Sequence, residues 1–264
     1  MGAILWGFES PFRQIIIPSI LKLSMKKNKF DIIIFLGRPA AGKSEVIDFF
    51  KNISLAERKK IFHIHDIVEI DDFRFLWDRG ENDNRREKKK KKRVDTRRIK
   101  TGSYVVRSRE IYKKLIEDIN RFYLKNYNDP GFIDKHTIFI EFSRCGAEGY
   151  SDSLQMLHKD ILEHAVIYYI NVSFKEAVRK NKRRYDPDKP ESILYHTVPF
   201  EVMRKYKTDD WKDLSSQQKE RIQAGLIKVP FAVFNNEPEK TDNRYKIKKE
   251  LLKSIHRLYD LYVE

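Results

Sequence analysis

Five short apolar runs recur along the chain, and the first of them is continuous rather than alternating. They are rich in β-branched and aromatic side chains, and they occupy Asp31–Leu36, Asp66–Ile70, Thr137–Glu141, Ala165–Asn171 and Val229–Phe234. A strand buried on both faces of a parallel sheet has this pattern, because helices cover both faces. The runs therefore predict five strands of one sheet.

The segments between these runs space their apolar residues as helices do. Ile111, Leu115, Ile119 and Tyr123, for example, recur every four residues. The same reasoning predicts helices over 45–52, 105–125, 151–163, 174–184, 200–205, 215–224 and 243–262. Strands that alternate with helices indicate a three-layer α/β domain with a parallel five-stranded sheet.

Three segments fall outside this alternation. Residues 73–104 and 185–227 are polar and longer than ordinary connections, so they are expected to be functional excursions. Residues 1–28 form an N-terminal extension that precedes the first strand. It has apolar patches but lacks the basic n-region and the cleavage site of a signal peptide. We therefore expect it to be either dispensable or an amphipathic segment that packs on the domain or on a partner.

The net charge of +15 is concentrated in one segment. Residues 85–100 hold eleven Lys and Arg against Glu87 and Asp95, a local +9, which leaves +6 for the rest of the chain. This distribution argues against a nucleic-acid-binding surface over the whole protein. The single cysteine, Cys145, excludes an internal disulfide and is typical of the cytoplasm. No run of about 18 apolar residues predicts a membrane span.

The first strand leads directly into a phosphate-binding motif. Gly37-Arg-Pro-Ala-Ala-Gly-Lys-Ser44 matches G-x-x-x-x-G-K-[ST], with a buried strand before it and a helix after it. The loop amides would cradle the phosphates of ATP, Lys43 would reach the β- and γ-phosphates, and Ser44 would take a Mg²⁺ position. The residues expected to bind the nucleotide here are Gly37, Ala40, Ala41, Gly42, Lys43, Ser44 and Glu45.

Acidic residues end two other predicted strands. Asp71 and Asp72 follow the second strand, and Glu141 closes the third. Ligands of parallel sheets bind at this end of the strands. Asp71 or Asp72 would orient or deprotonate an acceptor hydroxyl, and Glu141 would hold Mg²⁺ through water. The alternative is that these acids are loop residues or helix N-caps. Arg144 would grip an acceptor phosphate or carboxylate beside them.

Arginines after the fourth strand resemble those of a mobile lid. Arg179 and Arg183 share one helical face by their i, i+4 spacing, and Arg184 follows. Such arginines neutralise charge on a transferring phosphoryl group, although a solvated basic helix has the same pattern. After the fifth strand, Asn235 could read the edge of a purine, or simply form a turn.

The basic segment 85–100 has two readings. Five consecutive lysines flanked by arginines are normally a self-repelling loop, and we expect a mobile loop near the acceptor site. The alternative is contact with RNA, DNA or a polyphosphate. No aromatic residue lies within the segment, so base stacking is not supported.

Taken in order, these parts resemble the nucleoside-monophosphate-kinase-like branch of P-loop kinases over about residues 30–261. The resemblance rests on Gly37–Ser44, Asp71-Asp72, Glu141-Phe-Ser-Arg144, Arg179–Arg184 and Val229–Asn235. It implies ATP as donor, a sheet with strand order 2-3-1-4-5, and two insertions within the domain 29–264. These are a basic acceptor-side insertion (73–104) and a lid-like insertion (179–210). Asp71-Asp72 looks similar to small-molecule kinases of the shikimate, gluconate or zeta-toxin type.

The sequence therefore favours an ATP- and Mg²⁺-dependent kinase acting on a small anionic or nucleotide-like acceptor. A polynucleotide or tRNA kinase that uses 85–100 to hold the backbone is an alternative. A nucleotide-dependent ATPase or switch module without an acceptor is another. The acceptor and the oligomeric state stay open.

Overall fold

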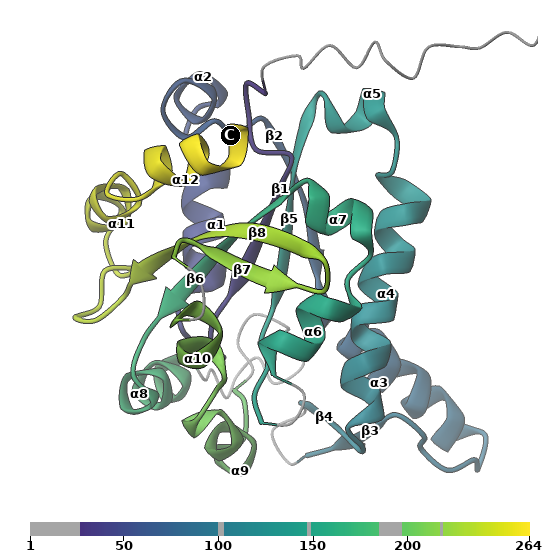
Figure 1. The fold of residues 1–264 in the computed structure, drawn as a ribbon. Coiled ribbons are helices and arrows are strands. Elements are labelled where there is room, and N and C mark those ends of the chain that lie inside the picture. Colours follow the sequence, from purple (N-terminus) through teal and green to yellow (C-terminus); the bar gives the residue numbers. More distant parts are fainter. Residues whose placement is uncertain (1–26, 100–102, 147–148, 185–196, 217–218) are drawn as a thin grey trace, which may run out of the picture.

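In the computed structural model, residues 27–99, 103–146, 149–184, 197–216 and 219–264 are described. Six strands form the central sheet in the order β2-β5-β1-β6-β8-β7 (Figure 1). Their bounds are β1 (Ile32–Leu36), β2 (Asp66–Asp71), β5 (His136–Phe142), β6 (Ala165–Asn171), β7 (Arg221–Ala224) and β8 (Ile227–Asn235). The neighbouring pairs from β2 to β8 are parallel, and β7 pairs antiparallel with β8. The carboxyl ends of five strands therefore meet along one edge.

Helices cover both faces of this sheet, as Figure 1 shows. The larger ones are α1 (Lys43–Lys51), α3 (Asp72–Lys88), α4 (Glu110–Asn126), α8 (Phe174–Arg184), α11 (Arg244–Leu251) and α12 (Ile255–Val263). The shorter ones are α2 (Leu55–Glu57), η1 (Arg58–Phe62), α5 (Pro130–Ile133), α6 (Tyr150–Met156), α7 (Lys159–Glu163), α9 (Phe200–Met203), η2 (Arg204–Lys207) and α10 (Trp211–Ser216).

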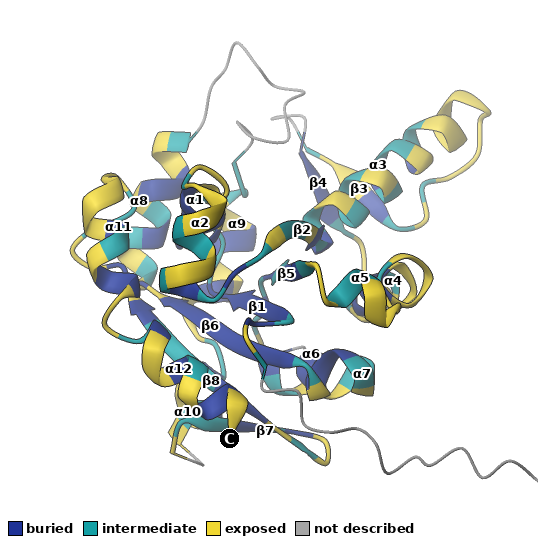
Figure 2. Cartoon of the chain, turned by 90° about the horizontal axis from the view of Figure 1, so that it is seen from above, coloured by how far each residue is buried: buried dark blue, intermediate teal, exposed yellow. Residues whose placement is uncertain are grey.

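Alternate residues of β1 belong to different hydrophobic cores. Ile33 and Phe35 pack with residues of α1, α8, α11 and α12, whereas Ile32, Ile34 and Leu36 pack with residues of α4, α6, α7 and α10. All five residues of β1 are buried (Figure 2). This two-sided burial is the physical origin of the continuous apolar runs in the sequence.

The sheet has a sixth strand that the sequence prediction lacked. We predicted a helix over 215–224, but α10 ends at Ser216 and β7 runs from Arg221 to Ala224. Ile222 and Ala224 are buried, whereas Arg221 and Gln223 are half-buried. A tight turn with Gly225 at φ +60° joins β7 to β8. The helix prediction was wrong here because the alternating apolar residues of this short edge strand resemble helical spacing.

The segment 73–104 is more regular than predicted. Its first part is α3, which continues into the basic run as far as Lys88, and β3 (Thr96–Arg98) pairs antiparallel with β4 (Tyr104–Val106). The predicted loop over 85–100 is therefore replaced by helix at 85–88 and by strand at 96–98, whereas 89–95 lie outside regular secondary structure. Two predicted helices are interrupted: 151–163 forms α6 and α7, and 243–262 forms α11 and α12.

Parts of four sequence predictions fall outside the described residues: 1–26 of the N-terminal extension, 100–102 of the basic insertion, 185–196 of the lid-like insertion and 217–218 of the helix predicted over 215–224. None of the described helices has the length and apolarity that a membrane span requires.

Candidate functional site

A cavity of about 690 Å³ lies where the parallel strands end. Its walls come from the phosphate loop, the ends of β2 and β5, the start of α3, strand β4, and the segment 197–206. Nine of the predicted site residues line it: Ala40, Gly42, Lys43, Ser44, Glu45, Asp71, Asp72, Glu141 and Arg144. A cavity of this size accommodates a nucleotide-sized ligand.

Backbone geometry in the phosphate loop requires its two glycines. Gly37 has φ +149° and Gly42 has φ +112°, conformations that side chains rarely adopt. A methyl group on Gly37 would lie 2.7 Å from the carbonyl oxygen of Ile170, and one on Gly42 would lie 2.6 Å from Asn236 Nδ2. The loop is therefore closely packed against the end of β6 and the segment after β8.

Lys43 lies buried at the start of α1, with its ammonium group held inside the loop. Its Nζ donates to the carbonyl oxygens of Gly37 (3.1 Å) and Arg38 (3.2 Å) and to Ser143 Oγ (2.8 Å). Burial lowers the pKa of Lys43, and the carboxylate of Glu141, 3.7 Å away, acts against that shift. A positive charge is thus fixed where the motif would place the phosphates.

Ser44 and Glu141 form the candidate magnesium position. Ser44 Oγ lies 3.3 and 3.4 Å from the two carboxylate oxygens of Glu141, at the cavity wall. No group of three or more His, Cys, Asp or Glu with metal-binding geometry exists in the described part of the chain. Mg²⁺ usually takes one or two protein oxygens and completes its shell with water and substrate phosphates. The pair therefore fits Mg²⁺ that arrives with a nucleotide.

Three carboxylates crowd the ends of β2 and β5. Asp71 and Glu141 are paired in the register of the two strands, and Asp72 follows as the first residue of α3. Burial, followed by repulsion from Glu141 and Asp72, raises the pKa of Asp71 well above its usual value. Burial also raises the pKa of Glu141, although Lys43 opposes the shift. A divalent cation would relieve this repulsion, so the donor set suits Mg²⁺.

Asp71 and Asp72 have different environments. Asp71 caps α3, with Oδ1 accepting the backbone N–H of Phe73 at 2.9 Å, and its Oδ2 has no hydrogen-bond partner among the described residues. Asp72 instead forms a buried ion pair with Nη1 of Arg144. The N-cap reading is thus correct for Asp71, but this role leaves one carboxylate oxygen available.

Arg144, which follows β5 and lines the cavity, is almost completely buried. Its Nη1 also donates to the Ser143 carbonyl at 2.8 Å, and its guanidinium lies over the rings of Tyr112 (5.4 Å) and Phe142 (5.1 Å). Its Nε and Nη2 atoms are buried without a hydrogen-bond partner. Buried donors normally have partners, so these two atoms point to a ligand that accepts from them.

The structure separates the three lid arginines. Arg179 and Arg183 do share a face of α8, but both pair with Glu239, at 2.5 and 2.8 Å, and neither lines the cavity. Arg184 does line it, and pairs with Glu45 at 3.4 Å. Among the arginines of α8, Arg184 is thus the one near the phosphate loop.

The described structure also puts Asn236, rather than Asn235, against the phosphate loop. Asn235 is exposed and its side chain accepts from Asn171 at 3.0 Å. Asn236 is fully buried, donates to the Ala41 carbonyl at 2.6 Å and accepts from the backbone N–H of Lys240 at 2.8 Å. Sequence reasoning missed Asn236, and the doubled asparagine was its only signal.

Arg38, a variable position of the motif, ties the phosphate loop to the lid-like segment. It donates from Nε to the carbonyl of Tyr206 (2.8 Å) and from Nη1 to that of Val172 (3.0 Å), and it pairs with Asp209 at 2.9 Å. Because these partners lie more than 130 residues away in the chain, no local pattern could have indicated them.

Comparison with known proteins gives structural similarity but no family. No family model and no curated protein matches the sequence. Among solved structures, Chaetomium thermophilum Kti12 in complex with ADP-AlF3 shares 12% identity at a TM-score of 0.48, over 87% of this chain and 97% of that one. A gluconokinase from Sinorhizobium meliloti 1021 shares 12% identity at 0.46, over 88% and 96%. A shikimate kinase from Bacteroides thetaiotaomicron shares 13% at 0.38, over 87% and 96%.

These similar structures include kinases, the kind of protein that the sequence resembles. At such identities and scores the likeness gives no information on substrate. The residues of the cavity alone indicate its chemistry.

Proposed function

We propose that this protein is an ATP- and Mg²⁺-dependent phosphotransferase that phosphorylates a hydroxyl group on an anionic acceptor. The observation that carries the proposal is the meeting, in one cavity, of a phosphate loop bearing Lys43 and Ser44 with the available carboxylate of Asp71 and the buried Arg144. A nucleotide-binding module alone would have no use for the last two.

The donor half of the cavity suits the nucleotide. The loop amides from Gly37 to Ser44 and the start of α1 favour phosphate oxygens, and Lys43 supplies a fixed positive charge. Ser44 and Glu141 would hold Mg²⁺, which neutralises charge on the phosphates when bound. Arg184, beside Glu45, is the arginine placed to approach the γ-phosphate.

Asp71 is assigned as the general base. As the acceptor oxygen forms its bond to the γ-phosphorus, its proton passes to Asp71 Oδ2, and the bond to the bridging oxygen breaks to release ADP. A carboxylate with a raised pKa accepts such a proton more readily than an ordinary one, because the transfer is better matched to neutral pH.

Arg144 is assigned to the acceptor's anionic group. Two unpartnered guanidinium nitrogens can donate in parallel to a carboxylate or phosphate, and Asp72 holds the guanidinium in place through Nη1. Asp72 is therefore a positioning residue, and Asp71 is the residue that contacts the reacting hydroxyl.

Two variants test the proposal in a screen that measures ADP release with a panel of anionic hydroxy compounds. Lys43→Ala should abolish turnover, whereas Lys253→Ala, an exposed lysine after α11, should not alter it. Asp71→Asn keeps the cap on α3 and should retain ATP binding while losing transfer to the acceptor. Full turnover in folded Lys43→Ala would refute the proposal. ADP release that no acceptor stimulates would identify an ATPase instead.

A further inference from the structure

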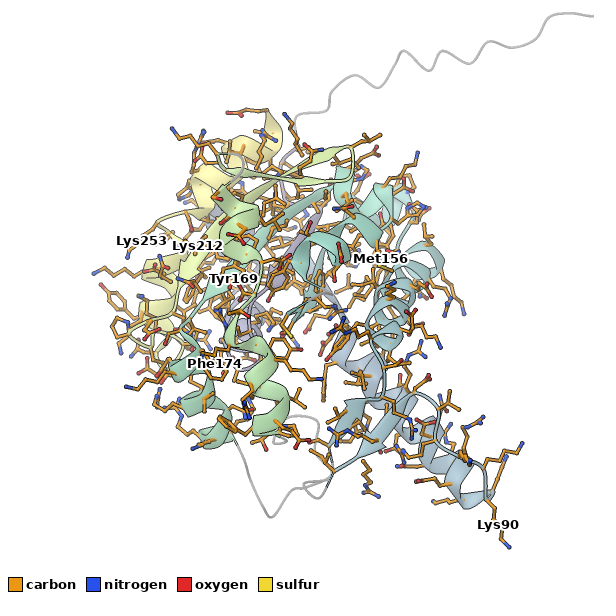
Figure 3. The ribbon with its side chains drawn as sticks, turned by 60° about the horizontal axis from the view of Figure 1, so that its bottom comes forward. Lys90, Met156, Tyr169, Phe174, Lys212 and Lys253 are labelled. Atoms are coloured by element: carbon orange, nitrogen blue, oxygen red, sulfur yellow. The ribbon has the colours of Figure 1, made fainter. Side chains whose placement is uncertain are left out.

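The basic run that the sequence singled out is part of an ordered projection. We call residues 80–98 the basic arm: the second half of α3, the turn after it, and β3. In Figure 3 the arm projects from the domain, with Lys90 at its outer end. Figure 2 likewise shows the end of α3 standing away from the other helices.

Asp83 holds the returning strand of the arm in place. Its buried carboxylate accepts the backbone N–H groups of Val94 (2.8 Å), Asp95 (3.0 Å) and Thr96 (2.7 Å), together with the Thr96 hydroxyl (3.0 Å). Burial acts to raise the pKa of Asp83, but these hydrogen bonds outweigh it and the pKa is lowered. One side chain thus anchors the segment that follows the lysines.

Arg93 closes the arm from the other side. Its guanidinium donates to Asn84 Oδ1 (2.7 Å), Glu87 Oε2 (2.8 Å), the Gly80 carbonyl (3.3 Å) and Thr96 Oγ1 (2.8 Å). Glu87, the acid next to the lysines, is therefore neutralised within the arm. Its charge is not available to the neighbouring lysines.

The five lysines between these anchors have no such partners. Lys88–Lys92 are exposed, and none of their ammonium groups forms a hydrogen bond or ion pair with a described residue. Exposed lysines elsewhere do pair with carboxylates, as Lys51 does with Glu69 (2.7 Å) and Lys248 with Glu57 (2.7 Å). The turn is fixed by backbone hydrogen bonds from Lys89, Lys90 and Lys91 to α3, with Lys90 at φ +56°. The five lysine charges are thus held close together on an ordered turn, although their mutual repulsion opposes this arrangement.

From this arrangement we infer that the basic arm is a docking surface for the phosphate backbone of double-stranded nucleic acid. Closely spaced, unpaired cations on a fixed frame match a regular row of phosphates. The described arm exposes only one large apolar side chain, Val94, which is too little for insertion into a membrane. It also has no aromatic side chain on which unpaired bases could stack. The inference does not depend on phosphoryl transfer.

The arm also relates this surface to the cavity. Helix α3 begins at Asp72, which lines the cavity, and ends at Lys88 in the arm. Seventeen residues of helix span about 25 Å at 1.5 Å per residue. Strand β4, which pairs with β3, lines the cavity through Tyr104 and Val105. Nucleic acid on the arm therefore lies on the acceptor side of the cavity, outside it.

The test is fluorescence anisotropy of the full chain with labelled RNA and DNA duplexes of 20 base pairs at 50–200 mM salt. Five phosphate contacts predict a loss of affinity of about 500-fold across this range. Replacing Lys88–Lys92 with glutamine should flatten the slope of log K against log salt by about 4.5. A matched control removes five exposed lysines elsewhere, at Lys175, Lys212, Lys228, Lys249 and Lys253. It should retain most of the slope.

Asp83→Asn tests whether duplex binding needs the ordered arm or only its positive charge. The substitution removes a negative charge, so charge alone predicts tighter binding, whereas loss of the Asp83 anchor predicts weaker binding. The melting temperature verifies that the domain stays folded. Lys43→Ala should bind duplexes as well as the native protein, which keeps this inference separate from the proposed activity. No duplex binding at 50 mM salt, an equal loss in the control variant, or preference for vesicles of anionic lipid would each overturn it.

Discussion

The buried pair between Asp72 and Arg144 offers a quantitative test of how the acceptor half of the cavity is held together. The two side chains are 11% and 2% exposed, so water screens their interaction poorly. Asp72→Asn retains an acceptor oxygen but leaves the guanidinium as an uncompensated buried charge. Breaking a buried pair typically costs about 3–5 kcal/mol, and the retained oxygen points to the lower end, about 3 kcal/mol.

A second substitution should restore part of that loss. Arg144→Met replaces the guanidinium with an apolar chain of similar length, so the double variant no longer buries an unpaired charge. We expect it to be about 2 kcal/mol more stable than Asp72→Asn alone. Urea denaturation measures both steps, and 3 kcal/mol corresponds to a midpoint shift of about 1 M for a slope of about 3 kcal/mol per M.

An exposed pair provides the control. Arg97 and Glu201 are 53% and 62% exposed at 2.8 Å, so Glu201→Gln should change stability by about 0.5 kcal/mol or less. If Asp72→Asn costs no more than this control, or if the double variant is less stable than the single one, the pair does not position Arg144 as proposed.

Three further predictions concern the phosphate loop, the base and the lid arginines. Gly42→Ala should lower the free energy of unfolding, measured by urea denaturation, by about 2–3 kcal/mol and abolish ATP binding. Gly225, at φ +60° with no atom within 4 Å of an added methyl group, is the control, and Gly225→Ala should cost about 1 kcal/mol. Equal costs would contradict the close packing at Gly42. For Asp71, the raised pKa means that the unfolded chain loses its proton first as pH rises, so native stability falls from about pH 4 upward until Asp71 itself ionises. Asp71→Asn should therefore raise the melting temperature at pH 8 but not at pH 4, and an equal shift at both would contradict this. Arg184→Ala should lower kcat by about 100-fold, while Arg179→Ala, which lies outside the cavity, should leave kcat unchanged; the reverse order would restore the original lid assignment.

The parallel strands could be predicted because buried strands consist mainly of apolar residues. The inner strands β1 and β6 have buried residues at successive positions, five in a row in β1 and six in β6. The edge strand β2 has a weaker signal, because Ile70 is its one buried residue. Strand β7 lacks this signal: it lies at the sheet edge and alternates four residues between buried and half-buried. Over so short a window, alternation and helical spacing give similar patterns.

The order of the basic arm could not be predicted from its own residues. Local charge repulsion indicates a loop, and basic residues in the last turn of α3 gain only a modest benefit from the helix dipole. What decides the outcome is the pairing of Asp83 with backbone groups 11 to 13 residues away. Such contacts depend on the returning strand, which a local pattern does not specify.

The residues of the cavity likewise differ in whether local sequence or long-range contacts determine their positions. The glycines, Lys43 and Ser44 act through local backbone geometry, so their motif reveals them. Arg144 depends on Asp72, which lies 72 residues away, and Asn236 on Ala41, 195 residues away. The sequence could indicate that these residue types are present, but only the fold shows which of them meet.

The arginines of α8 show that residue spacing predicts which side chains share a helical face, whereas packing determines what that face contacts. Arg179 and Arg183 share a face because they are four residues apart, yet that face meets Glu239, which holds both charges. Arg184 lies one residue further, about 100° around the helix, and reaches the cavity. The direction of each face is fixed by the buried positions Ala177 and Asn181 of the same helix.

This placement has an electrostatic consequence for the donor site. The charged groups that act on the Lys43 ammonium are the carboxylates of Glu141, Asp72 and Asp71 and the guanidinium of Arg184. Asp72 is in turn paired with Arg144, so Lys43, Arg184 and Arg144 together face three carboxylates. With Arg179 and Arg183 committed to Glu239, α8 adds only the charge of Arg184 to this balance. A triphosphate would bring further negative charge to this group. In the proposed function, Mg²⁺ that arrives with the nucleotide would offset that charge, and Ser44 and Glu141 are the residues that would hold it.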